Sequence, residues 1–89
     1  MQLQLDDVAL FTRIAKLGTL SAAARERNVP VSQVSRALAR LEARLGVQLL
    51  NRTTRRISPT PEGEIYLSHA RRILAEIDDM EQLVSSAVA

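Results

Sequence analysis

The amino-acid sequence predicts a mainly α-helical fold in which three helices and a two-stranded β-hairpin precede one long C-terminal helix. Apolar residues recur at helical spacing through almost the whole chain of 89 residues. Isolated glycines and prolines interrupt this pattern and divide it into separate stretches. The last stretch, in contrast, continues for about 27 residues without a turn signal strong enough to end a helix.

The first helix is expected over residues 7–17. Asp6 is the expected N-cap, because its carboxylate can accept hydrogen bonds from free amides of the first turn. Gly18 can adopt the left-handed conformation that ends a helix. The inward-facing apolar residues are Leu10, Phe11, Ile14 and Leu17.

The second helix is short and is expected over residues 21–27. It opens with three alanines at 22–24, and such small side chains let a neighbouring helix approach closely, as in a helix-turn-helix. Pro30 disfavours helix in the residue before it, so residues 28–30 are expected to form a turn.

The third helix is expected to begin at Val31 or Ser32 and to end at Leu45, with Gly46 as its stop. Its buried stripe is predicted to consist of Val34, Leu38, Leu41 and Leu45. The opposite face is polar and positive, and it carries Ser32, Gln33, Arg36 and Arg40, with Ser35 at its edge.

The next two segments do not have helical periodicity. Residues 47–52 and 57–59 flank a basic sequence at 53–56, which is typical of a β-hairpin with a positively charged tip. Pro59 cannot donate a hydrogen bond within a sheet, so its strand must be short or lie at an edge.

The long helix has the clearest start in the sequence. Thr60 is the expected N-cap, Pro61 suits the first helical position and Glu62 suits the first turn. A coiled-coil seam with alternating spacings of four and three is formed by Tyr66, Ala70, Ile73, Ile77, Met80, Val84 and Ala87. A second stripe is formed by Leu67, Leu74 and Leu83. We interpret the seam as a homodimer interface; the alternative is a helix folded back over its own core.

The distribution of charge is more informative than the net charge of +2. Residues 25–56 hold eight arginines against two glutamates, whereas residues 57–89 hold two arginines against six acidic residues. Salt screens charges beyond about 8 Å at physiological ionic strength, so a polyanion would experience the local positive region. Arginine-rich helices are also common in high-GC bacterial proteins, so charge alone leaves nucleic-acid binding open.

Composition narrows the class of protein further. The chain contains no cysteine, which excludes disulfide bonds and thiolate metal sites. Its first seven residues carry two acids and no basic region, unlike a signal peptide. No uncharged apolar run approaches the roughly 20 residues that span a bilayer. We therefore expect a soluble, cytoplasmic protein without membrane contact.

The residues do not indicate an enzyme. His69 is the single histidine and lies in an acidic helix without a second metal ligand at a suitable spacing. Asp78 and Asp79 are adjacent on that helix, so their side chains point about 100° apart and do not converge. The three glycines are isolated and form no phosphate loop. We expect no catalytic residue, no metal and no cofactor.

Nucleic-acid binding fits the pattern better, and double-stranded DNA is the favoured form. The two aromatic residues, Phe11 and Tyr66, are assigned to the core and the seam, which leaves no exposed ring for stacking single-stranded bases. A helix that enters the major groove and cations that hold the backbone are what duplex DNA requires. The sequence therefore predicts a winged helix-turn-helix. The competing class is a helical interaction module whose basic face docks an acidic protein.

Several segments also carry a family resemblance. They are the sequences at 20–24, 34–36, 41–42, 45–47, 49–56 and 60–63, together with Val29. In order and without gaps, they resemble the DNA-binding region of the LysR-type transcriptional regulators over nearly the whole chain. The sequence departs from the family pattern at Arg27, Pro30 and Pro59. A MarR-like winged helix fits less well, because such proteins place dimerisation helices before the first helix found here.

The resemblance implies an operator-binding domain at 1–59 and a linker and dimerisation helix at 60–89. It implies a recognition helix that meets the major groove through Val31, Ser32, Gln33, Ser35 and Arg36. It implies a wing that contacts DNA through Arg52, Thr54, Arg55 and Arg56. The family's effector-binding domain has no counterpart here, so a small-molecule effector is expected only for the full-length parent.

Together these inferences predict a homodimer that places two recognition helices in successive major grooves of a partly palindromic operator and regulates transcription. Arg36 is the expected direct reader, since arginine can bond a guanine edge in two places, and the alternative for it is a phosphate contact. Gln33 is the next candidate. Arg40 lies further along the helix, where a backbone contact is the simpler expectation.

Overall fold

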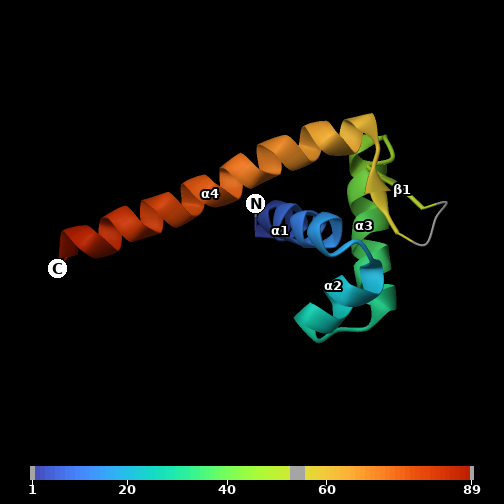
Figure 1. Cartoon of the computed structure of the whole chain (residues 1–89), viewed down its shortest axis with the longest axis horizontal. Coiled ribbons are helices and arrows are strands. Elements are labelled where there is room, and N and C mark those ends of the chain that lie inside the picture. The colour runs from blue at the N-terminus through green and yellow to red at the C-terminus, as the bar shows by residue number, and fades with distance from the viewer. Residues whose placement is uncertain (1, 53–55, 89) are drawn as a thin grey trace.

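The computed structural model describes residues 2–52 and 56–88. Within them the order of elements confirms the predicted winged helix-turn-helix followed by a long final helix (Figure 1). The elements are α1 (Gln2–Leu17), α2 (Leu20–Arg27), α3 (Val31–Leu45), β1 (Leu50–Asn51), β2 (Ser58–Pro59) and α4 (Pro61–Val88).

α1 begins more than one turn before its predicted start. It starts at Gln2, so the prediction that Asp6 caps this helix is wrong. Glutamine and leucine are good helix formers and continue the helix towards the N-terminus, with Asp6 inside it. The predicted end is confirmed: Gly18 has a φ of +85°, and its N–H donates to the Ile14 carbonyl at 2.8 Å.

α2 starts one residue before its predicted start because Thr19 is its N-cap. The Thr19 hydroxyl accepts the Ala22 N–H at 3.0 Å. Ala23 and Ala24 are buried, which confirms that small side chains lie where α2 packs closely on its neighbours. Asn28 ends the helix in the left-handed region with a φ of 59°, a conformation that asparagine tolerates better than most residues.

α3 begins at Val31 and ends at Leu45, and the N–H of its C-cap Gly46 donates to the Glu42 carbonyl at 2.8 Å. Val34, Leu38 and Leu41 are buried as predicted and pack with Phe11 of α1 in the core. The prediction that Leu45 continues this stripe is wrong, because its side chain is 44% exposed. Leu45 is the last helical residue, one turn beyond the last buried position of the stripe.

The β-hairpin is shorter than predicted and pairs Leu50 with Pro59 and Asn51 with Ser58 in antiparallel register. The predicted N-cap of the following helix is confirmed. The Thr60 hydroxyl accepts the Gly63 N–H at 3.0 Å and donates to the Gln48 carbonyl at 2.7 Å. This buried threonine therefore joins the start of α4 to the loop before β1.

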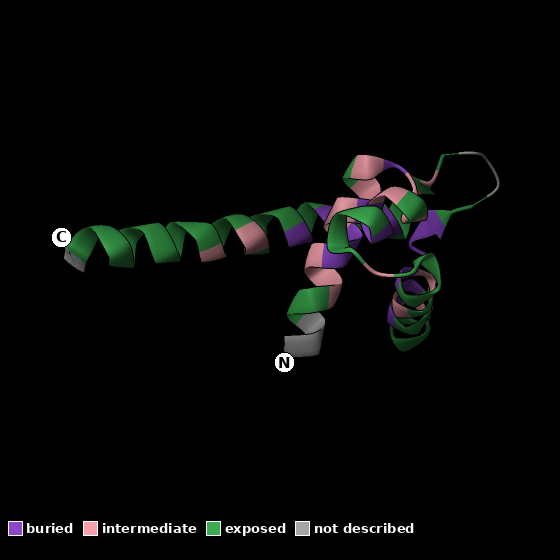
Figure 2. Cartoon of the chain, turned by 90° about the horizontal axis from the view of Figure 1, so that it is seen from below, coloured by how far each residue is buried: buried purple, intermediate pink, exposed green. Residues whose placement is uncertain are grey.

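α4 packs on the domain only through its first turns and then runs outwards (Figure 2). Leu67 and Ala70 are buried, Leu74 and Ile77 are half-buried, and residues 78–87 are exposed. The alternative of a helix folded back over its own core is therefore wrong. The resulting molecule measures 50 × 28 × 22 Å.

Candidate nucleic-acid interface

The outer face of α3 is the first part of the candidate site. Because Val34, Leu38 and Leu41 are held in the core, the helix turns its other side to solvent. That side exposes Val31, Ser32, Gln33, Arg36 and Arg40, whereas Ser35 is half-buried at its edge. The exposure of this face, called the reading face below, agrees with the predicted arrangement of short side chains at the N-terminal end and guanidinium groups further along. Its contact with DNA stays a prediction.

The turn before α3 fixes where this face begins. The left-handed Asn28 donates its N–H to the carbonyls of Ala24 and Arg25, and the extended Pro30 then leads into the helix. The Gln33 N–H donates to the Pro30 carbonyl at 3.0 Å, so the first turn of α3 is closed without a side-chain cap.

A shallow groove of about 440 Å³ adjoins the reading face. Arg27, at the end of α2, lines this groove together with Gln33 and Arg40, and Asp6 and Asp7 line it from α1. Sequence reasoning did not assign Arg27 to the site, because only the turn between α2 and α3 brings it beside Arg40. Arg27 is exposed and adds positive charge next to the outer face of α3, to which Arg40 belongs.

Two other arginines are held by acidic residues of neighbouring helices. Arg44 Nη1 lies 3.1 Å from Asp7 Oδ2 and ties α3 to α1. Arg13 donates two hydrogen bonds to Glu26, at 2.8 and 2.6 Å, and ties α1 to α2. The hydrogen bond from Arg13 lowers the pKa of the Glu26 carboxyl below its ordinary value.

The wing is the second part of the candidate site. Arg52 and Arg56 are exposed beside the two strands, whereas the predicted residues Thr54 and Arg55 lie outside the described residues. The Ile57 N–H donates to the Gly18 carbonyl at 3.0 Å. A Cβ atom on Gly18 would lie 2.7 Å from Arg56 Nη2, so glycine allows this guanidinium to approach the loop between α1 and α2.

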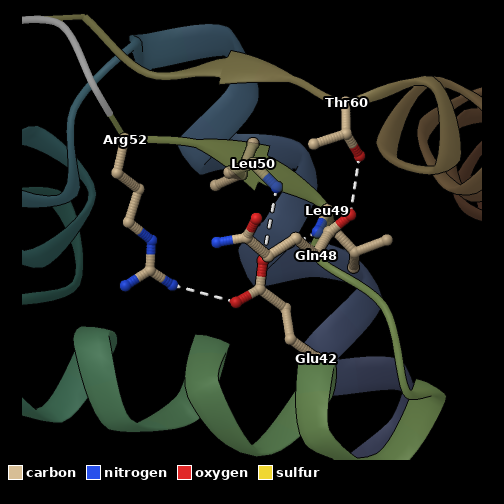
Figure 3. A network of polar contacts seen from close by, with 6 residues as sticks. All are labelled: Glu42, Gln48, Leu49, Leu50, Arg52 and Thr60. Carbon is tan, nitrogen blue, oxygen red and sulfur yellow. Dashed lines mark hydrogen bonds and ion pairs between the residues drawn. The ribbon is translucent and has the colours of Figure 1, made fainter.

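Arg52 is held by Glu42, a residue to which sequence reasoning gave no role of its own (Figure 3). Arg52 Nη2 donates to Glu42 Oε1 at 3.0 Å. Glu42 Oε2 accepts the backbone N–H groups of Leu49 at 2.7 Å and Leu50 at 3.3 Å. The sequence contains one signal that could have pointed to a role for Glu42: it is one of only two acidic residues among the residues at 25–56.

The exposed apolar residues of α4 form a second candidate surface, for protein rather than for DNA. Ile73 is 43%, Met80 54% and Val84 60% exposed. Ile77 is half-buried and Ala87 is exposed, so these five predicted seam residues all have accessible surface.

Of the first two predicted seam residues, Ala70 does not belong to this surface, and Tyr66 packs partly against α1. Ala70 is only 1% exposed, so the prediction that it contacts a partner is wrong. Tyr66 is half-buried, and its ring meets Phe11 of α1 edge-on with centroids 5.0 Å apart. Burial raises the pKa of Tyr66 above its ordinary value, with a smaller contribution from the charge of Asp7. α1 therefore covers the beginning of the seam within the same chain.

The described residues contain no group of three or more histidine, cysteine or acidic side chains that could hold a metal ion. His69 is exposed on α4, and its Nδ1 lies 3.0 Å from Arg72 Nη2. In the part of the chain that the structure describes, no helix combines the length and hydropathy required to cross a membrane.

Comparison with known proteins agrees with this geometry. Residues 5–64 match the family described as "Bacterial regulatory helix-turn-helix protein, lysR family". An HTH-type transcriptional regulator of Xanthomonas campestris pv. campestris is 41% identical over 80 residues, which are 90% of this chain and 23% of that protein. The chain thus spans about a quarter of the length of the curated relatives it matches.

Two solved structures share the fold over almost the whole chain. The complex of BenM_DBD with benA site 1 DNA superposes with a TM-score of 0.89 at 27% identity and covers 96% of both chains. The CbnR_DBD-DNA complex superposes with a TM-score of 0.82 at 33% identity and covers 96% of this chain and 98% of that one.

Proposed function

The chain belongs to the LysR family of bacterial helix-turn-helix regulators, and on that premise we propose that it binds duplex DNA sequence-specifically as a homodimer. The observation that carries the proposal is the exposed outer face of α3, whose N-terminal half combines short polar side chains with Arg36. The two similar structures named as DNA complexes support the same assignment. The protein would regulate transcription in the bacterial cytoplasm and would not act as an enzyme.

In this proposal residues 1–59 bind the operator and residues 60–89 pair two protomers. Two recognition helices related by two-fold symmetry would enter successive major grooves, so the operator would be partly palindromic with half-sites about one helical turn apart. Bending of the DNA would allow a longer spacing. Sensing of a small effector is proposed for the full-length protein only.

Selection of bound duplexes from a randomised library at physiological salt tests the proposal. Enrichment of a two-fold symmetric motif would support a sequence-reading dimer, and the half-site spacing would give its geometry. Recovery of duplexes without a motif would contradict sequence reading. Failure to retain any duplex would instead favour an acidic protein as the partner of the basic face.

Replacing Arg36 by alanine is expected to weaken binding to the selected site by about 1–3 kcal/mol and to relax the preference at one base pair. The reason is that a guanidinium can bond a guanine edge in two places. Binding titrations with the selected site and with single-base variants measure both effects. Arg71→Ala is the matched control, because Arg71 is exposed on α4. Uniform weakening on all sequences would reassign Arg36 to a phosphate contact.

Binding is also expected to depend strongly on salt. If about four arginines of each protomer reach phosphates, the dimer neutralises about eight. Since each phosphate contributes about 0.9, the log–log slope of affinity against salt should lie near −7. Titrations between 50 and 200 mM salt (about a fourfold range) measure it. A slope shallower than about −3 would exclude this extent of backbone contact.

A further inference from the structure

Glu42 is the point at which α3 and the wing are joined. Its side chain is only 12% exposed, compared with 39% for Arg52. One carboxylate oxygen accepts from Arg52, and the other accepts from the amides of Leu49 and Leu50 (Figure 3). The carboxylate of Glu42 therefore connects α3 to the start of β1 and to Arg52, the residue that follows β1.

The ion pair between Arg13 and Glu26 shows what is particular to this arrangement. That pair is shorter, at 2.6 Å, but its two side chains are 37% and 41% exposed. Exposed pairs contribute little to stability because water screens them and their side chains lose freedom. Glu42, in contrast, is mostly covered and bonds two backbone amides as well as Arg52.

Arg52 could reach a DNA phosphate only by leaving Glu42. Its departure would leave a mostly covered carboxylate without its cation, and such separation costs more than the loss of an exposed pair. Arg27, Arg36 and Arg40 are exposed, and no ion pair is found for them among the described residues. These arginines can contact phosphate without such a cost.

We propose that Glu42 and Arg52 are positioning residues that fix the wing relative to the reading helix, and that Arg52 itself does not contact DNA. The inference rests on the proposed DNA binding and states how the two halves of that interface are held together. It reassigns Arg52, which the family resemblance places among the contact residues.

Glu42→Gln distinguishes a positioning role of Arg52 from a phosphate contact, because the two roles predict opposite changes in DNA affinity. If Arg52 positions the wing, losing the ion pair weakens DNA binding about three- to tenfold, and Arg52→Gln does the same. The double variant should then be no weaker than either single variant, because both remove one interaction. If Arg52 contacts phosphate, Glu42→Gln releases the cation and removes a negative charge, so affinity rises, and this result would overturn the proposal.

The salt dependence gives a second, independent outcome. If Arg52 only positions the wing, Glu42→Gln and Arg52→Gln change the slope of log affinity against log salt by the same amount. If Arg52 itself contacts phosphate in each protomer, the slope becomes shallower by about 1.8 in the Arg52→Gln dimer but not in the Glu42→Gln dimer, and this result would also overturn the proposal. Glu26→Gln is the matched control: it removes one carboxylate and releases Arg13 without touching the wing, so affinity should stay equal or rise.

Amide NMR spectra of the unbound chain test the same link without DNA. Glu42→Gln and Arg52→Gln should shift the same amide resonances, those of Leu49, Leu50 and their neighbours in β1 and β2. Unchanged wing resonances in Arg52→Gln would refute a positioning role. If the wild-type chain bound no duplex, the proposed function would fail, whereas these spectra would still decide whether the ion pair holds the wing.

Discussion

Gly63→Ala is expected to destabilise the folded chain by about 3 kcal/mol or more, the upper part of the range for overpacking. A Cβ atom on Gly63 would lie 2.0 Å from the Leu49 carbonyl oxygen and 3.2 Å from Pro59 Cβ. The first neighbour is backbone, and the same oxygen accepts the Thr60 N–H at 2.9 Å. The loop before β1 cannot withdraw without breaking the bonds that start α4.

The direction of this effect is opposite to that of helix propensity. Alanine is favoured over glycine inside a helix by about 1 kcal/mol, so an open position would gain stability from the same change. Urea unfolding at equal protein concentration measures the difference. Gly46→Ala is the control: no neighbouring atom of the described residues lies within 4 Å of its Cβ position, and its φ of +76° predicts a loss of only about 1 kcal/mol. Equal losses in the two variants would show that packing against Leu49 is not the cause.

Much of the fold follows from periodicity and from helix-end residues. The spacing of Val34, Leu38 and Leu41 predicts which side of α3 is buried, and therefore which side is free to contact DNA. Thr60 and Pro61 predict the start of α4, and Gly18 predicts the end of α1. Each of these signals is local, so a single sequence contains it.

The features that were not predicted depend on contacts between distant segments. Glu42 acquires its role because the chain turns after Gly46 and returns two backbone amides to its carboxylate. Arg27 joins the candidate site because a turn brings it beside Arg40. No residue pattern within one helix records such partners.

The seam of α4 shows the same limit in another form. Its spacing of four and three predicts an apolar face but does not state what covers that face. In the structure Ala70 is buried within the single chain and Tyr66 packs edge-on against Phe11 of α1, whereas the described seam residues from Ile73 onwards keep accessible surface. For Ala70, hydrophobic periodicity therefore predicted correctly that the residue lies on an apolar face. It predicted the wrong neighbour, because Ala70 is covered within its own chain and not by a partner.

Met80→Glu is expected to convert the proposed dimer to a monomer and to weaken binding to a two-half-site operator about 100-fold or more. Met80 is 54% exposed in the single chain, so the substitution leaves the core of each domain intact. Glutamate forms helix about as well as methionine, but in the dimer it would bury an unpaired charge near Asp78, Asp79 and Glu81. Sedimentation and DNA titrations measure the two consequences.

Gln82→Glu is the control for Met80→Glu, because it adds the same charge to α4 at a position outside the predicted seam. Gln82 lies two residues further along α4, about 200° around the helix from Met80, and is exposed. This variant should stay dimeric and should bind the operator like the wild-type chain. Loss of the second half-site also predicts that the salt slope of Met80→Glu falls to about half, because one protomer then contacts half of the phosphates. A Met80→Glu chain that sediments as a dimer and keeps the full slope would place the dimer interface elsewhere on the molecule, and the exposed residues of α4 would need another partner.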